Sequence, residues 1–146
     1  MSNCKIDLQS IITGLSKLKK KALKKQTEML KPFGLTSRHA GYIMALSDGR
    51  GMTMKALSET LCVDPANTTR VIAYLDEMGY VANDCQKDGC RKFNVFLTDK
   101  GKEIAVQMKK SVACNSVEIM DPLTEDEKRT FVYLLFKMAM DNNDEE

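Results

Sequence analysis

Apolar residues recur at helical spacing between residues 4 and 31 and leave one continuous stripe. The stripe consists of Leu8, Ile11, Ile12, Leu15, Leu18 and Ala22, and the opposite face holds Lys17, Lys20, Lys21, Lys24 and Lys25. Pro32 and Gly34 are expected to end this helix. A helix of this length spans about 40 Å, more than one small core can cover, so the stripe is expected to meet a second copy of the chain.

Two shorter helices are expected next, each after a residue that suits a helix N-cap. Thr36 is expected to cap a helix that runs to about Leu46, and Thr53 to cap one that ends near Leu61. Between them, residues 48–51 have the glycine-rich composition of a loop. A brief turn then separates the second helix from a third.

The third helix has well-marked boundaries. Asp64 is expected to be its N-cap, with Pro65 in the first turn, where the missing N–H costs nothing, and Gly79 is expected to end it. The apolar stripe of this helix is Val71, Ile72, Leu75 and Met78. The outward face therefore holds Ala66, Asn67, Thr69, Arg70, Ala73 and Tyr74.

Two short segments after this helix, 80–84 and 92–98, favour strands. In the second segment, Phe93, Val95 and Leu97 alternate with Lys92, Asn94 and Phe96. The residues between the two segments are rich in glycine and charge, so we expect a β-hairpin.

Two helices are expected to complete the chain, a long one from Asp99 and a last one after Thr124, where Glu127 completes a capping box. The order of elements predicts a mainly α fold with a small β-hairpin wing. We expect a winged helix-turn-helix over residues 35–98, flanked by helices in residues 1–34 and 99–146, to which the family resemblance described below assigns dimerisation.

Composition excludes several classes of protein. Of the 146 residues, 43% are hydrophobic and 29% are charged, the balance of a globular protein. No apolar run approaches the roughly 18 residues that cross a bilayer, and the N-terminus lacks the pattern of a signal peptide. We therefore expect a cytoplasmic protein without membrane contact, whose five scattered cysteines are thiols and not a disulfide framework.

Signals for catalysis and metal binding are weak. His39 is the single histidine, and the sequence shows no nucleophile beside a base, no phosphate-binding loop and no paired carboxylates on one face. We expect neither an enzyme nor a metal site nor a bound cofactor.

Charge is uneven along the chain. Residues 1–34 carry 8 basic and 2 acidic side chains (+6), residues 35–98 carry 7 of each (0), and residues 99–146 carry 7 basic and 11 acidic (−4). The lysine face of the first helix is expected to pair with the acidic last segment, or else to touch phosphates. A neutral middle is less than a DNA-binding domain usually has, and it supports the alternative of a winged helix that binds protein and not DNA.

The third helix is the candidate for reading bases. Two helices joined by a tight turn and followed at once by a hairpin can place the second helix in a major groove about 12 Å wide. The asparagine and threonine of its outward face can bond base edges, and the arginine can bond a guanine or a phosphate. The residues assigned to DNA are Asp64, Ala66, Asn67, Thr69, Arg70 and Tyr74. The alternative is a solvated polar surface.

These motifs together resemble the MarR family of transcriptional regulators. The matching residues are Leu35-Thr36, Met54 to Glu59, Val63-Asp64, Thr69-Arg70, Leu75, Met78 to Val81, Arg91 and Leu97 to Gly101. No single piece is diagnostic, but the ordered combination is fairly specific, and the resemblance covers nearly the whole chain.

The resemblance implies a homodimer whose N- and C-terminal helices intertwine. It also implies a regulator, more often a repressor, that a small ligand or an oxidant releases from double-stranded DNA. Each copy would place the third helix in a major groove and the wing tip in the adjacent minor groove. The target would be a pseudo-palindrome with half-sites about one helical turn apart.

The wing is expected to contact DNA through Lys87, Arg91 and Lys92. Arg91 matches the arginine with which this family enters the minor groove. Gly89 and Cys90 replace an acidic and a basic residue that family wings usually carry. Either Asp88 supplies the lost carboxylate from one position earlier, or Arg91 is less firmly oriented.

The resemblance further implies a cleft for a small effector between the dimer helices and the winged helix. Arg38, His39 and Tyr42 would line such a cleft; the alternative is that they form the solvated side of their helix.

Three cysteines are candidates for redox sensing. Cys4 lies at the start of the first helix, where the helix dipole can lower a thiol pKa. Cys85 and Cys90 flank the hairpin tip, where a disulfide between them would distort the wing. Cys62 and Cys114 are expected to be ordinary packing residues.

Overall fold

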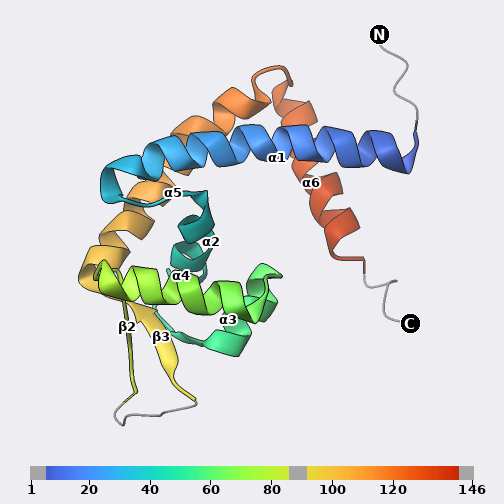
Figure 1. Cartoon of the computed structure of the whole chain (residues 1–146). Helices are drawn as coiled ribbons and strands as arrows, with labels where there is room; N and C mark the ends of the chain where they lie inside the picture. The colour runs from blue at the N-terminus through green and yellow to red at the C-terminus, as the bar shows by residue number, and fades with distance from the viewer. Residues whose placement is uncertain (1–5, 86–91, 142–146) are drawn as a thin grey trace. The chain divides into compact units, whose positions relative to one another are not determined.

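The computed structural model describes residues 6–85 and 92–141, with side chains for all of these except residues 112–117. The chain divides into two compact units, Met1–Ser111 and Val112–Glu146. The helices are α1 (Leu8–Leu30), the short 3-10 helix η1 (Lys31–Phe33), α2 (Ser37–Ala45), α3 (Met54–Leu61), α4 (Pro65–Glu77), α5 (Asp99–Met120) and α6 (Glu125–Ala139), and the strands are β1 (Met52–Thr53), β2 (Val81–Asn83) and β3 (Asn94–Leu97) (Figure 1). The predicted fold, mainly α with a small wing, is confirmed.

The two helices of the helix-turn-helix begin at the predicted caps. Thr53 Oγ1 accepts a hydrogen bond from the N–H of Ala56 (3.1 Å) at the start of α3. Asp64 Oδ1 accepts one from the N–H of Ala66 (2.7 Å) at the start of α4. These caps satisfy N–H groups that have no partner inside the helix, so the local sequence fixes both starting points.

The first helix begins later than the sequence predicts. Its N-cap is Asp7, whose carboxylate accepts a hydrogen bond from the N–H of Ser10 (2.8 Å). The predicted start placed Cys4 in the first turn, but Cys4 lies outside the described residues. The proposed effect of this helix end on its thiol is therefore untested.

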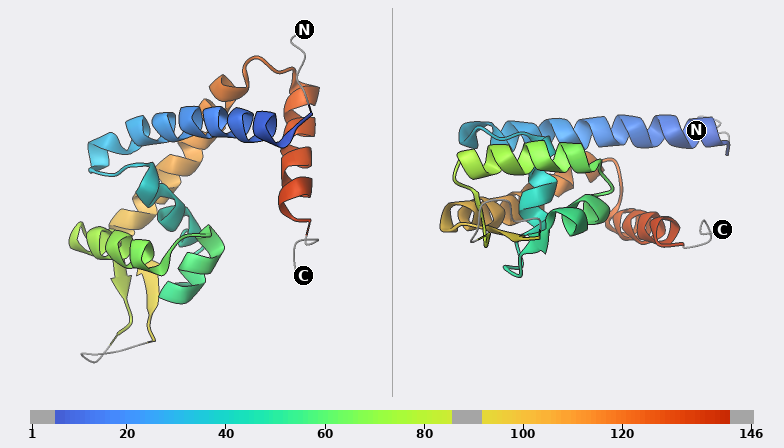
Figure 2. Two further views of the ribbon diagram at one scale, coloured as in Figure 1. Left: turned by 45° about the vertical axis from the view of Figure 1, so that its right-hand side comes forward. Right: turned by 60° about the horizontal axis from the view of Figure 1, so that its bottom comes forward.

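The sheet has one strand more than the predicted hairpin. β2 and β3 pair antiparallel, with Val81 opposite Leu97, and run side by side in both views of Figure 2. β1 pairs with the other edge of β3, with Met52 opposite Val95, so the strand order is β1-β3-β2. The sequence pattern did not indicate β1, because two residues are too few to show an alternation.

The first unit has a single apolar core, to which α2, α3, α4 and the sheet contribute. Its buried residues are Leu30, Leu35, Ala40, Tyr42, Ile43, Leu46, Leu57, Val71, Ile72, Leu75, Tyr80, Val81, Val95, Leu97, Ile104, Ala105 and Met108. The end of α1 supplies Leu30, and the start of α5 supplies Ile104 and Met108. The core therefore crosses both borders of the segment 35–98, and the division into residues 1–34, 35–98 and 99–146 stays a prediction about function.

Three buried hydroxyls connect the helices of this core. Tyr42 Oη of α2 is hydrogen-bonded to Thr68 Oγ1 of α4 (3.1 Å), and Ser58 Oγ of α3 lies 2.9 Å from the same oxygen. Within the described ranges, no buried side-chain nitrogen or oxygen lacks a hydrogen-bond partner. Because hydrogen bonds are directional, this network specifies how α2, α3 and α4 meet.

Large apolar side chains are exposed in the first turns of α1 and along the whole of α6. On α1, Leu8 is 72% exposed and Leu15 is 45% exposed, and on α6 Phe136 is 57% exposed. The other large exposed apolar residues of these two helices are Ile11, Ile12, Leu23, Val132, Tyr133, Leu134 and Met138. None of the residues of α6 is fully buried, and much of its apolar stripe is exposed in the single chain.

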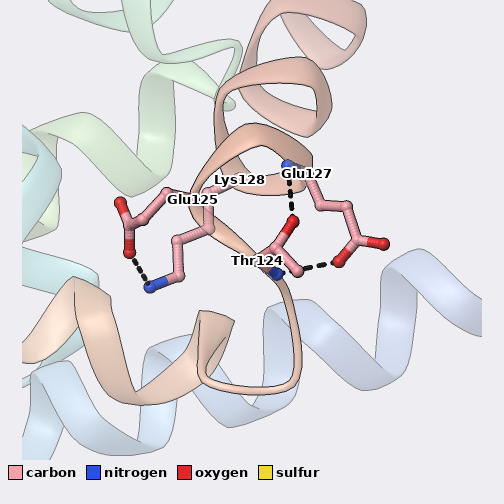
Figure 3. Close-up of polar contacts among 4 residues, drawn as sticks. All are labelled: Thr124, Glu125, Glu127 and Lys128. Carbon is pink, nitrogen blue, oxygen red and sulfur yellow. Dashed lines mark hydrogen bonds and ion pairs between the residues drawn. The ribbon is translucent and has the colours of Figure 1, made fainter.

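α6 begins with the predicted capping box. Thr124 Oγ1 accepts a hydrogen bond from the N–H of Glu127 (3.3 Å), and Glu127 Oε2 accepts one from the N–H of Thr124 (2.8 Å) (Figure 3). Beside it, Lys128 Nζ lies 2.8 Å from Glu125 Oε1. None of the helices in the described ranges combines the length and apolar character of a bilayer-spanning segment.

Candidate nucleic-acid interface

α4 is held in the core by one face and leaves the other face open. Thr68, Val71, Ile72 and Leu75 are its buried residues. The outer face presents Ala66, Thr69, Arg70, Ala73 and Tyr74, and Asn67 is half-buried. The helix has 13 residues and is therefore about 20 Å long, enough to follow a major groove across several base pairs. The predicted orientation of the helix is confirmed.

The outer face of α4 is narrow, because small side chains form much of it. Ala66 and Ala73 are exposed and present only a methyl group each. Thr69 Oγ1 donates a hydrogen bond to the carbonyl of Pro65 (3.1 Å), so its oxygen is left as an acceptor. Such a face lets the helix backbone come close to base edges.

Arg70 is the cation of this face. Its side chain is exposed, and no ion pair within the described part of the chain includes it. A guanidinium in this position can form a bidentate pair with guanine or with a phosphate.

The side chain and the main-chain carbonyl of Asp64 already accept hydrogen bonds at the start of α4. Its carboxylate accepts the N–H of Ala66, and its main-chain carbonyl accepts the N–H of Thr68 (3.1 Å). A carboxylate at the cap takes one of the N–H groups that could otherwise bind a phosphate, so this helix start is poorly suited to phosphate. Contact between Asp64 and DNA stays a prediction.

Tyr74 has partners inside the chain. Its hydroxyl donates a hydrogen bond to the carbonyl of Gly34 (2.6 Å), and its ring stacks on His39 with 4.8 Å between ring centroids. The ring is 36% exposed. The hydroxyl that was expected to reach DNA is thus directed at the turn after α1.

The three residues expected to line an effector cleft are not equivalent. Arg38 is exposed and His39 half-buried, but Tyr42 is only 2% exposed and bonds Thr68 inside the core. The expectation that Tyr42 faces an open cleft is therefore wrong for this structure. The resemblance alone suggested the cleft, and the sequence did not reveal this contact because Thr68 is 26 residues away.

His39 stabilises the start of α2. Its Nδ1 accepts a hydrogen bond from the N–H of Thr36 (2.9 Å), which closes a capping box. Burial, followed by the neighbouring Arg38 guanidinium, lowers the pKa of His39 below its ordinary value of 6.5. The imidazole is therefore held in its neutral form, as an acceptor.

The turn between α3 and α4 depends on Cys62. This residue has a left-handed backbone conformation (φ 52°), and the N–H of Val63 closes the turn on the carbonyl of Ser58 (3.0 Å). Cys62 is exposed, so the expectation that it packs in the core is wrong. The side chain of Cys114 lies outside the described residues.

The base of the wing is fixed by a contact that the sequence did not reveal. Asp84 Oδ1 accepts the main-chain N–H of Asn94 (2.6 Å), and Asp84 Oδ2 accepts its side-chain amide (3.1 Å). These two hydrogen bonds lower the pKa of the Asp84 carboxyl from its ordinary value. The only signal for this contact in the sequence is that Asp84 and Asn94 occupy facing positions of the predicted hairpin.

The predicted contacts at the wing tip are largely outside the described residues. Lys87, Cys90 and Arg91 lie there, as do Asp88 and Gly89, so their assignments stay predictions. Lys92 is exposed at the start of the returning segment. The main-chain N–H of Cys85 donates to Asn83 Oδ1 (3.1 Å). Because Cys90 lies outside the described residues, a disulfide between Cys85 and Cys90 stays a prediction.

Comparisons with known proteins agree with this geometry. A sequence profile of the MarR family matches residues 33–89. The HTH-type transcriptional regulator SarZ of Staphylococcus epidermidis is 33% identical over 87 residues, which are 58% of this chain and 57% of SarZ. The alignment thus spans little more than half the length of this curated relative.

Solved structures resemble the chain over most of its length. A MarR transcriptional regulator from Methanosarcina mazei Go1 is 26% identical with a TM-score of 0.81, covering 90% of this chain and 94% of that one. A mutant MarR from E. coli complexed with operator DNA is 27% identical with a TM-score of 0.74, covering 90% and 98%.

Proposed function

The chain belongs to the MarR family of winged-helix regulators, and from this premise we propose that it is a sequence-specific DNA-binding regulator of transcription. The observation that carries the proposal is the outer face of α4, where small uncharged side chains surround the exposed Arg70. The similarity to a mutant MarR from E. coli that is complexed with operator DNA supports DNA as the partner.

The proposal includes a homodimer. The apolar residues on α1 and α6 remain exposed in the single chain, although their helical periodicity is that of a buried stripe. A second copy would cover identical patches in an isologous interface. A dimer would then offer two copies of α4 to a pseudo-palindromic duplex with half-sites about one helical turn apart.

We also include repression that a small ligand or an oxidant relieves. This part rests on the family alone. Arg38 and His39 remain candidates for a ligand contact because their side chains are accessible from α2.

Titration of duplex binding with salt tests the proposal. The logarithm of the binding constant should fall steeply and linearly with the logarithm of salt concentration, because the protein displaces counterions from phosphates. A duplex selected by the wild-type chain from a random pool supplies the probe. Retention of no duplex, or a flat salt response, would favour the alternative of a protein-binding module.

Arg70→Ala is the matching substitution. Loss of one bidentate contact with guanine is expected to weaken binding by about 5- to 150-fold at that base pair, with the dimer intact. Arg129→Ala is the control, because it removes the same charge from an exposed arginine of α6. Equal affinity of the wild type and the Arg70 variant would refute the assignment. Arg91→Ala is expected to weaken binding as well, through the wing.

A further inference from the structure

Four side-chain hydrogen bonds converge on the C-terminal end of α4 and the residues that follow it. Tyr74 Oη donates to the carbonyl of Gly34 (2.6 Å), and Tyr80 Oη donates to the carbonyl of Phe33 (2.7 Å). From the other side, two side chains donate to the carbonyls of Gly79 and Met78, namely Thr98 Oγ1 (2.6 Å) and Lys100 Nζ (2.9 Å). We call Tyr74, Met78, Gly79 and Tyr80 the α4 anchor.

The first pair of bonds ties the α4 anchor to the end of α1. Phe33 and Gly34 form the turn that closes α1, and the N–H of Leu35 returns to the carbonyl of Leu30 (3.2 Å). Gly34 has φ +70°, and a Cβ on it would lie 3.1 Å from Met78 Cε. The two carbonyls therefore lie in the turn that directly follows α1, and both phenols reach them from the winged helix.

The second pair ties the same anchor to the start of α5. Thr98 Oγ1 donates to Gly79 and also accepts the N–H of Gly101 (3.2 Å), so one hydroxyl caps α5 and bonds the end of α4. Lys100 Nζ bonds the last carbonyl of α4 and lies 4.6 Å from the centre of the Tyr80 ring. At Gly101, any Cβ would overlap the carbonyl oxygen of Tyr80.

Helix packing alone restricts these elements to a few classes of crossing angle, with a scatter of roughly 15–20° within each class. Apolar contacts are non-directional, whereas a hydrogen bond to a main-chain carbonyl has a preferred distance and direction. Burial, followed by the neighbouring Tyr74, raises the pKa of the Tyr80 phenol from its ordinary value of 10.0, so the phenol keeps the proton that it donates. The anchor is thus built to resist rotation of α4 relative to α1 and α5.

We propose that the α4 anchor sets the distance between the two recognition helices of the dimer, with Tyr74 and Tyr80 as positioning residues and not DNA contacts. This inference rests on the proposed function. α1 carries part of the exposed apolar surface assigned to the dimer, and α5 leads directly into the segment that carries the rest. Because the α4 anchor fixes α4 to α1 and to α5, the geometry of the dimer determines which half-site spacing the two copies of α4 can occupy.

Spacing selectivity is the property that tests this role. One base pair added between half-sites moves them apart by about 3.4 Å and turns one by roughly a tenth of a helical turn. A firmly anchored pair of helices should reject such a duplex, whereas a loosely anchored pair should follow it. A residue that only contacts DNA would lower affinity equally at every spacing.

The experiment compares Tyr74→Phe, Tyr80→Phe and the double variant with the wild type. Binding is measured on the duplex selected by the wild type from a random pool, and on the same duplex with one base pair inserted or deleted between its half-sites. The preference for the native spacing is expected to fall by about 2- to 10-fold in each single variant and further in the double variant.

Tyr42→Phe is the matched control. It removes a hydroxyl of the same kind from the same unit, but its partner Thr68 lies within the helix-turn-helix and not on α1 or α5. This variant should keep the wild-type spacing preference. Circular dichroism and sedimentation confirm that all variants fold and have the wild-type oligomeric state.

The possible results distinguish a failure of this inference from a failure of the proposed function. If the wild type prefers one spacing and the phenylalanine variants keep that preference, or lose affinity equally at all spacings, the inference is overturned and the proposed function stands. If the wild type retains no duplex at all, both are overturned. A reduced preference in the anchor variants, absent from Tyr42→Phe, supports the inference.

Discussion

The winged helix and the helices α1 and α6 use similar apolar patterns with opposite results. In the winged helix, residues such as Leu57 and Leu75 are fully buried, and the hydroxyls of its core have partners within the chain. On α1 and α6, residues at the same helical spacing remain exposed, among them Leu15 at 45% and Phe136 at 57%. The pattern thus shows that a surface will be buried, but not whether the same chain or another one covers it.

This difference predicts which parts of the chain fold alone. The winged helix, together with the end of α1 and the start of α5, buries its apolar residues in one core and satisfies its buried polar groups, so the sequence of this part of the chain specifies its structure. The exposed stripes of α1 and α6 leave apolar area in water, which favours association. Substitutions in the exposed stripes of α1 and α6 should therefore change the oligomeric state. Substitutions in the winged helix should change the free energy of unfolding.

The largest effect is expected from Leu15→Glu on α1. Burying a leucine contributes about 1.5–3 kcal/mol, and a symmetric interface contains the residue twice, so the dimer should weaken by about 3–6 kcal/mol, or roughly 10²- to 10⁴-fold in its dissociation constant. Analytical ultracentrifugation over a concentration series measures this change. Helix content should remain close to that of the wild type.

Thr13→Glu provides the control for the added charge. Thr13 is exposed on the lysine side of α1, opposite the apolar stripe, so its variant should dimerise like the wild type. Equal dissociation constants for Leu15→Glu and the wild type would show that the stripe is not an interface between copies.

Gly101→Ala is expected to have the next largest effect, on the stability of the winged helix. A new Cβ would overlap the carbonyl oxygen of Tyr80, so α5 must shift. Overpacking of this kind costs about 1–3 kcal/mol. Chemical denaturation should show a lower free energy of unfolding.

Gly14→Ala sharpens the same comparison, since nothing lies within 4 Å of a Cβ at Gly14 on α1. Replacing a glycine by alanine in an open helix adds roughly 0.5–1 kcal/mol of stability. The two glycine variants should thus shift the unfolding midpoint in opposite directions. A loss of stability for Gly14→Ala would mean that a second chain approaches α1 closely at this point.

Tyr42→Phe should produce a smaller loss. It removes one hydrogen bond from the buried network and leaves Thr68 with Ser58 as partner, a loss of about 0.5–1.5 kcal/mol. Urea denaturation detects this loss, and the dimer dissociation constant should not change. A dimer defect equal to that of Leu15→Glu would contradict the separation of the two regions.

The sequence predicted the parts of this fold that depend on near neighbours. Caps such as Thr53, Asp64 and Thr124 bond N–H groups two or three residues later, so spacing alone reveals them. The outward face of α4 follows in the same way from helical periodicity. The order of these elements was sufficient to indicate the winged helix.

Contacts between distant residues were not predictable in the same way. Tyr74 bonds a carbonyl 40 residues away, and Tyr42 a hydroxyl 26 residues away. Helical spacing contains no information on which other element lies opposite a side chain, so neither hydrogen bond could be predicted from it. The short strand β1 was missed for the same reason, since it exists only through its pairing with β3.

The smallest expected effect concerns pH and the start of α2. Burial and Arg38 lower the pKa of His39 below 6.5, so the unfolded chain binds a proton more readily than the folded one. The stabilising contribution of neutral His39 is therefore complete above pH 6.5 and declines as pH falls through this value. Thermal unfolding between pH 7.5 and 5.5 measures the decline, and the carboxylates titrate mostly below this window.

His39→Gln isolates this contribution. Glutamine at this position can still accept the N–H of Thr36 and close the capping box, but it does not titrate. Because His39 is the single histidine of the sequence, the difference between the two proteins cancels the remaining titrations. The wild type should lose more stability than the variant on acidification. Parallel curves for the two would show that the proton affinity of His39 does not change on folding.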